Sequence, residues 1–180
     1  MGDRFVAFLI AASAAIVGGC ASSQPVSERL DPDTATTVTV MDHPVELVAD
    51  SALPGGSDPF AFIAPFETDR MGERTLFLWV STPESMGAKV QPQQLLCNGQ
   101  PVGLQPLEGP LQQLALSRAP YASPTPWSAQ WYFRLAEDGL KCLATAQAIS
   151  LETRASEGQA ARFTADRKNL ASLEAFTTRR

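Results

Sequence analysis

Polar and apolar residues alternate along much of the chain, and this period of two predicts β-strands. Residues 37–40 (Thr-Val-Thr-Val) alternate as a strand with one buried face does, and residues 45–48 form a second run of this kind. The clearest hairpin pairs residues 60–66 with residues 75–81 around a turn at 69–72. Apolar residues occupy both faces of its second arm, so we expect that arm to be covered on both sides.

The strand pattern continues beyond this hairpin, with one long interruption. Asn98-Gly99 lies between two apolar runs, residues 95–97 and 102–107, which predicts a hairpin with a type I′ turn. Residues 108–126 contain four prolines and are expected to form a long connection.

The last third of the chain predicts more strands and one helix. Strands are expected at residues 127–135, 140–145 and 148–153, and a final hairpin leads to Phe163. After it, Asp166 is placed to cap a short helix with Leu170, Leu173 and Phe176 on one side. About nine short strands and one helix indicate a mainly β fold, namely an antiparallel β-sandwich or barrel, with an immunoglobulin-like sandwich among the alternatives.

Residues 1–19 have the pattern of a signal peptide. The mostly apolar run at residues 5–17 would rise roughly 20 Å as a helix, short of the ~30 Å hydrocarbon core of a bilayer. The sequence Val17-Gly18-Gly19-Cys20 then resembles the lipobox of bacterial lipoproteins. This resemblance implies cleavage before Cys20, a diacylglyceryl group on its thiol and an acylated amine, which together give a stable anchor. The alternative is an ordinary secretory signal with an incidental cysteine.

Residues 20–35 have no apolar period and are expected to form a lipidated, flexible tether. A single β-rich periplasmic domain is then expected at residues 36–180, long enough to bury roughly 70% of its unfolded surface. Ala21 stands where lipoproteins retained in the inner membrane carry Asp. The resemblance therefore favours the outer membrane, on its periplasmic face.

Cys97 and Cys142 are the cysteines that remain when Cys20 is assigned to lipid. An even number of cysteines in an oxidising compartment predicts a disulfide between them. Each lies at the edge of an expected strand, so the bond is expected to join two sheets. A separated, reduced pair is the alternative, and the absence of a Cys-x-x-Cys motif argues against redox catalysis.

Composition removes several classes of function. A net charge of -5 argues against nucleic acid. His43 is the single histidine and there is no Gly-x-Ser-x-Gly motif, so no catalytic residue is assigned. The scattered aspartates lack the spacing of a calcium loop, and no metal ion or cofactor is expected. Two carboxylates that meet in space, as in a glycosidase, remain an open alternative.

Tyr121 and Trp127 are the candidate partner-binding residues. They lie in or beside the proline-rich connection, where aromatic side chains on loops can contact a partner, although core packing is the simpler role for aromatic residues. The sequence thus favours a non-enzymatic, lipid-anchored protein that binds or scaffolds another envelope protein or component. The alternatives are a carboxylate-dependent envelope hydrolase and a carrier of a small apolar ligand.

Several short motifs after the expected signal peptide resemble segments of other proteins. They are Leu30-Asp31-Pro32-Asp33-Thr34, Val38-Thr39-Val40, Arg70-Met71-Gly72 and Leu78-Trp79. These segments look like uncharacterised small lipoproteins of proteobacteria, a resemblance that implies no activity. Residues 138–142 resemble the turn and strand before the second cysteine of immunoglobulin domains, but Leu140 stands where tyrosine is usual, so only a general sandwich analogy follows.

Overall fold

The computed structural model describes residues 25–53, 59–85, 88–107, 109, 111–154, 158 and 160–179. The predicted signal peptide, Cys20 and the beginning of the predicted tether lie outside the described residues. The strands are β1 (Val26–Asp31), β2 (Thr36–Met41), β3 (Val45–Ala49), β4 (Phe60–Arg70), β5 (Glu73–Ser85), β6 (Ala88–Lys89), β7 (Gln91–Cys97), β8 (Gln100–Pro101), β9 (Leu104–Pro106), β10 (Ser128–Leu135), β11 (Ala148–Arg154) and β12 (Ala160–Asp166). The helices are α1 (Glu137–Thr145), α2 (Ala171–Arg179) and two short 3-10 turns, η2 (Leu111–Leu114) and η3 (Arg167–Asn169).

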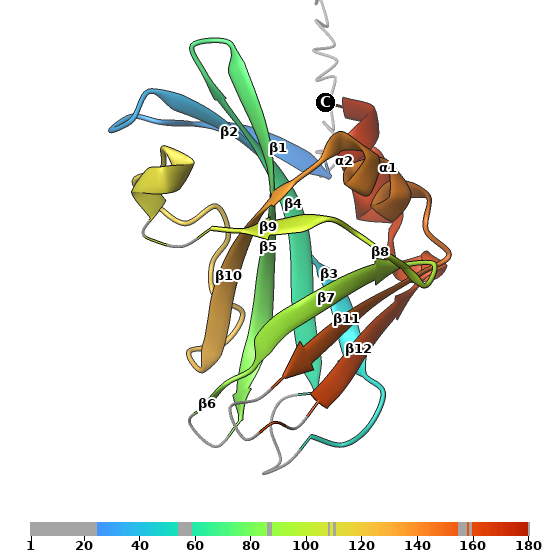
Figure 1. Cartoon of the computed structure of the whole chain (residues 1–180). Helices are drawn as coiled ribbons and strands as arrows, with labels where there is room; N and C mark the ends of the chain where they lie inside the picture. The colour runs from blue at the N-terminus through green and yellow to red at the C-terminus, as the bar shows by residue number, and fades with distance from the viewer. Residues whose placement is uncertain are drawn as a thin grey trace, which may run out of the picture.

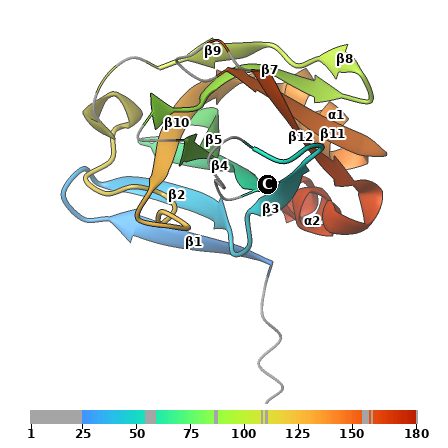
Figure 2. The same cartoon turned by 90° about the horizontal axis from the view of Figure 1, so that it is seen from below.

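The strands form one curled antiparallel sheet (Figures 1 and 2). Neighbouring strands follow the order β8-β7-β11-β12-β3-β4-β5-β10-β9, and β2 joins β4 and carries β1 on its other edge. The sheet curves into a half-barrel with the two α-helices packed together beside it. The predicted mainly β, antiparallel fold is confirmed, in a form closer to a barrel than to an immunoglobulin-like sandwich.

The central hairpin β4–β5 is apolar on both faces, as the sequence predicts. Ile63 pairs with Val80 and faces the interior of the half-barrel, whereas Phe66 pairs with Phe77 and faces outward. Met71 (φ 56°) and Gly72 (φ 86°) form the tight turn, and two consecutive positive φ angles are typical of a type I′ turn. The strands therefore separate two hydrophobic clusters.

The inner cluster is the main core, and the C-terminal helices complete it. Leu140 and Leu143 of α1 and Leu173 and Phe176 of α2 are fully buried in it. The predicted C-terminal helix is thus confirmed, but its predicted cap is wrong, because α2 begins at Ala171 and Asp166 precedes η3 without a capping hydrogen bond from its side chain. Its last residue, Arg179, donates a hydrogen bond from its guanidinium to the carbonyl of Val26, so α2 ends at the start of β1.

The predicted strand at residues 140–145 is wrong, because this segment is α1. Gly139 reads as a turn residue in the sequence but serves a close contact between helix and sheet. A Cβ there would lie 2.9 Å from Leu135 Cδ1 and 3.0 Å from Val102 Cγ1. Glu137 and Asp138 in the first turn also favour the helix through its macrodipole.

The predicted extent of the tether is also wrong. Residues 26–31 form β1, which pairs along its whole length with β2, from Val26 opposite Met41 to Asp31 opposite Thr36. Its middle residues, Glu28 to Leu30, are exposed, so this edge strand lacks the alternation by which buried strands are found. The folded domain consequently begins at Val26.

Cys97 and Cys142 form a disulfide, with Cα atoms 6.2 Å apart. The pairing is confirmed, but the bond joins β7 to α1 and not two sheets, because residue 142 is helical. The neighbouring β7–β8 hairpin turns at Asn98 (φ 50°) and Gly99 (φ 79°), as the Asn-Gly pair predicts. The disulfide therefore ties α1 to the sheet next to this turn.

Candidate functional site

Tyr121 is buried in the outer hydrophobic cluster, against the outer face of the sheet. Its side chain is 7% exposed and packs against Trp79, with ring centroids 5.0 Å apart. Its hydroxyl accepts a hydrogen bond of 3.0 Å from the amide of Met41 and donates one of 2.7 Å to the carbonyl of Pro65. Tyr121 thus fixes the long connection to the outer face of the sheet.

Asp31 and Arg29 of β1 hold the same connection from the other side. The Asp31 carboxylate accepts hydrogen bonds from the amide of Ser117 (2.7 Å) and from its hydroxyl (2.8 Å). These bonds, the amide bond foremost, lower the pKa of Asp31. Arg29 donates to the carbonyls of Ala119 and Pro120, at 2.9 and 3.0 Å. A cleft of about 110 Å³ beside these residues is accordingly part of a structural clamp.

Trp127 is 57% exposed, unlike Tyr121, and remains available for contact. It directly precedes β10, and its carbonyl accepts a hydrogen bond of 3.0 Å from the amide of Glu84, the next-to-last residue of β5. A single exposed apolar side chain is ordinary, and contiguous apolar surface is what marks an interaction site. Trp127 therefore matters only together with a cleft that begins a few residues further along, at Gln130 of β10.

The cleft lies where the half-barrel is incompletely closed, between β7 and β10. The short strands β8 and β9 bridge this seam at one end, since β8 pairs with β7 and β9 pairs with β10 (Figure 1). Beyond β9, the two long strands enclose a space of about 430 Å³, which we call the seam cleft. Its walls consist of Gln91, Pro92, Pro106, Leu107, Gly109, Gln130, Trp131, Tyr132 and Phe133.

The described side chains of the seam cleft are uncharged, and three of those on β10 are held in place by hydrogen bonds. The Gln130 side-chain oxygen accepts from the Trp79 indole (3.2 Å) and from the Tyr132 hydroxyl (3.1 Å). The Trp131 indole donates to the Thr82 hydroxyl at 2.9 Å. Burial raises the pKa of Tyr132 to about 12. The described walls therefore offer a ligand aromatic and amide groups and no charge.

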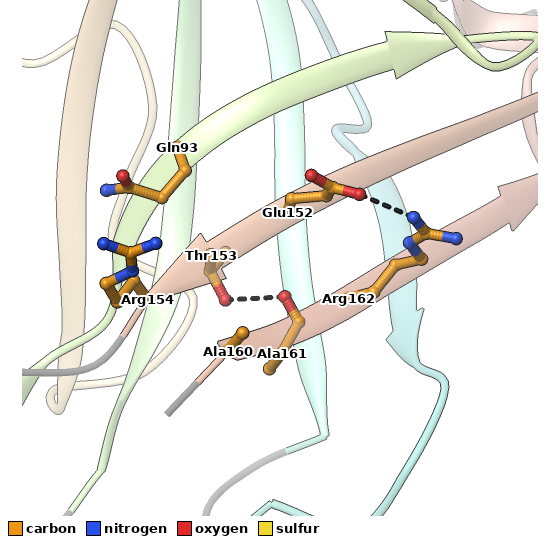
Figure 3. A pocket seen from close by; sticks show the side chains of 7 residues that line it. All are labelled: Gln93, Glu152, Thr153, Arg154, Ala160, Ala161 and Arg162. Carbon is orange, nitrogen blue, oxygen red and sulfur yellow. Dashed lines mark hydrogen bonds and ion pairs between the residues drawn. The ribbon is translucent and has the colours of Figure 1, made fainter. Parts of the chain in front are cut away.

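A second groove, of about 330 Å³, runs over β11 and β12 (Figure 3). Glu152 and Arg162 form an ion pair of 2.5 Å there, and the hydrogen bond that Arg162 donates to the Glu152 carboxylate raises the pKa of Arg162. The Thr153 hydroxyl donates to the carbonyl of Ala161 at 3.1 Å. Figure 3 shows Arg154 and Arg162 directed away from one another, so their guanidinium groups do not converge on one ligand.

The described residues bring together no metal site and no acid pair in a cleft. No three His, Cys, Asp or Glu side chains among them cluster as metal ligands. The carboxylates that line the clefts, Asp31 and Glu152, lie in different places. His43 is exposed in the turn between β2 and β3, as its proline neighbour suggests. No helix in the described part of the chain is long and apolar enough to cross a bilayer.

Comparisons of the chain with protein-family models, with curated proteins and with solved structures find no match. The residues of the seam cleft must therefore be interpreted from their own geometry. Sequence reasoning missed them because β7 and β10 meet only through tertiary folding. Trp131, Tyr132 and Phe133 carry a signal in the sequence, as consecutive aromatic residues within an expected strand.

Proposed function

We propose that this protein is a lipid-anchored, non-catalytic binding protein of the bacterial envelope, attached to the periplasmic face of the outer membrane. The Cys97–Cys142 disulfide is the observation that supports a location outside the cytoplasm, because structural disulfides persist in oxidising compartments and are rare in the cytosol. The sequence at Cys20, which resembles a lipobox, supports attachment by lipid.

The short spacing between Cys20 and β1 defines where the domain would act. Five residues, Ala21 to Pro25, separate the lipidated cysteine from Val26. Even fully extended, this segment spans only about 20 Å. A lipid on Cys20 would hold the domain next to the headgroups, which favours a partner that is itself at the membrane.

The seam cleft and Trp127 are the surface that we assign to binding. The cleft is the largest of the three described here, and it carries aromatic and amide groups. Trp127 directly precedes β10 and is three residues before Gln130 of the cleft. Apolar walls with a few fixed polar groups are typical of ligand sites. The groove on β11 and β12 lacks aromatic residues among its lining side chains.

Intact mass of the protein purified from native envelope tests the anchor. We expect a chain that starts at Cys20 and carries acyl groups, and a Cys20→Ala variant that is released from membranes. The matched variant Ala21→Asp keeps Cys20 and should stay lipidated while moving to the inner membrane, in keeping with the lipoprotein resemblance. A mature chain without acyl groups would contradict the anchor.

A further inference from the structure

The strand β9 covers only part of the free edge of β10. Its three residues pair with Phe133, Arg134 and Leu135. The amide of Leu107 then makes one more bond, of 3.0 Å, to the carbonyl of Tyr132, and η2 begins at Leu111 on the outer face. No described strand pairs with residues 128–131 on this side of β10. The seam cleft lies where a continuation of β9 would run.

The backbone of β10 presents hydrogen-bonding groups to this space. In an antiparallel strand, the N–H and C=O groups of alternate residues point to opposite neighbours. The Tyr132 carbonyl bonds to Leu107 on the seam side, so Gln130, two residues earlier, also directs its N–H and C=O to the seam. Trp131, between them, directs its backbone N–H and C=O to β5, where it pairs with Val80. The edge of β10 at Gln130 is thus open to pairing.

We infer that the seam cleft binds an extended, uncharged peptide segment of a partner protein as an added antiparallel strand on β10. This inference rests on the binding role proposed above and names its partner. The added strand continues the line of β9, so its backbone pairs with Gln130 through the same hydrogen bonds that β9 makes further along. It extends the sheet at a place where the fold leaves an edge uncovered.

The walls of the cleft define the chemistry of this segment. None of the described residues that line the cleft is charged, so a charged side chain would lose hydration against these walls without gaining an ion pair from them. Trp131 and Phe133 lie on one face of β10 and Tyr132 lies on the other, and these aromatic groups suit alternating small or apolar side chains. Pro92 on the opposite wall has no amide hydrogen, so the segment pairs with β10 and not with β7 at that residue.

The test uses a blocked hexapeptide with the sequence of β2, Thr-Thr-Val-Thr-Val-Met, which is uncharged and alternates. We expect it to bind the detergent-purified mature protein with a Kd below about 1 mM. Hydrogen exchange at the amide of Gln130 should slow at least about tenfold with saturating peptide. The amide of Trp131, which already pairs with β5, should not change. Absence of binding, or binding without protection at Gln130, would overturn the inference.

Two variants of one residue separate the backbone from the side chain. Gln130→Ala and Gln130→Pro both remove the amide side chain that holds Trp79 and Tyr132. Only Gln130→Pro also removes the N–H that faces the cleft, and proline is tolerated on an edge strand when its nitrogen points outward. We expect the proline variant to bind the peptide about three- to tenfold more weakly than the alanine variant. Equal affinities for two folded variants would refute pairing at Gln130.

This outcome is independent of the anchor. A protein without acyl groups that still binds the peptide would remove the proposed attachment and leave the seam site intact. An acylated protein that ignores the peptide would do the opposite. A peptide with a central Lys or Glu supplies the charge control, and equal or tighter binding of that peptide would contradict the uncharged specificity.

Discussion

The Tyr121 hydroxyl donates a hydrogen bond of 2.7 Å to the carbonyl of Pro65. It occupies the place of the backbone hydrogen bond that would continue the pairing of β2 with β4 beyond Val40 and Phe66. Val40 pairs with Phe66, so Met41 would come opposite Pro65. Proline has no N–H and cannot complete that pair. The hydroxyl accepts from the Met41 amide instead, which joins the connection to the sheet at the point where pairing ends.

Tyr121→Phe should destabilise the fold by about 1–3 kcal/mol, because it leaves the buried Met41 amide and Pro65 carbonyl without their common partner. Chemical denaturation measures the loss. Tyr132→Phe is the control, since Tyr132 is only half-buried and its hydroxyl bonds to a side-chain oxygen. A control variant that lost as much stability as Tyr121→Phe would show that the effect is not specific to the bridge.

Removal of the disulfide by the double change Cys97→Ser and Cys142→Ser should cost about 4 kcal/mol on the chain-entropy account of a bridge over 45 residues. Reduction of the unaltered protein should lower its unfolding midpoint by about as much as the double substitution does. Since α1 is fastened to β7 by this bond, hydrogen exchange in α1 should rise more than in β4 and β5. A uniform change across the domain would contradict local fastening.

The free energy of unfolding should decrease at acid pH because Asp31 becomes protonated. Its pKa is lowered in the folded protein, chiefly by the Ser117 amide, so the carboxylate stabilises the fold above its ordinary pKa of 3.8. That contribution is lost as the pH falls from 3.8 towards the lower folded value. Asp31→Asn should flatten the pH profile of unfolding in this range. An unchanged slope in the variant would show that other carboxylates govern acid unfolding.

In the folded protein, both tyrosines should ionise at a higher pH than a free tyrosine does. The chain has two tyrosines, and burial raises the pKa of Tyr132 to about 12 and that of Tyr121 further still. We expect little phenolate absorbance at pH 10 in the folded protein. After unfolding, the tyrosines should titrate with a midpoint at about pH 10. Because the unfolded tyrosines ionise first, stability should decline as the pH rises above 10. A folded protein with half-ionised tyrosine at pH 10 would contradict this burial.

The sequence was sufficient for elements that carry a local signal. The β4–β5 hairpin, the Asn98-Gly99 turn and the cysteine pair all follow from patterns within short windows. The sequence does not predict helix α1, because Gly139 suggests a turn, although the apolar spacing of Leu140, Leu143 and Ala144 is helical. Glycine stands at position 139 because Leu135 and Val102 lie too close for a larger residue, and this is a tertiary contact.

The candidate site was less accessible from sequence for the same reason. Tyr121 and Trp127 belong to one proline-rich stretch, yet one is buried and the other exposed, and no local pattern distinguishes them. Strand β1 has no signal in the sequence, because an edge strand with exposed Glu28, Arg29 and Leu30 lacks the alternation of polar and apolar residues. The open edge at Gln130 depends on where β9 stops, which only the assembled sheet reveals.

The bond from Arg179 to the Val26 carbonyl brings the two ends of the domain together on one side. A reporter protein fused after Arg179 would therefore sit beside the start of β1 and crowd whatever lies next to it. A label inserted at the Met71-Gly72 turn, which lies at the tip of β4 and β5 and leaves Met71 almost wholly exposed, would avoid the junction of the two termini.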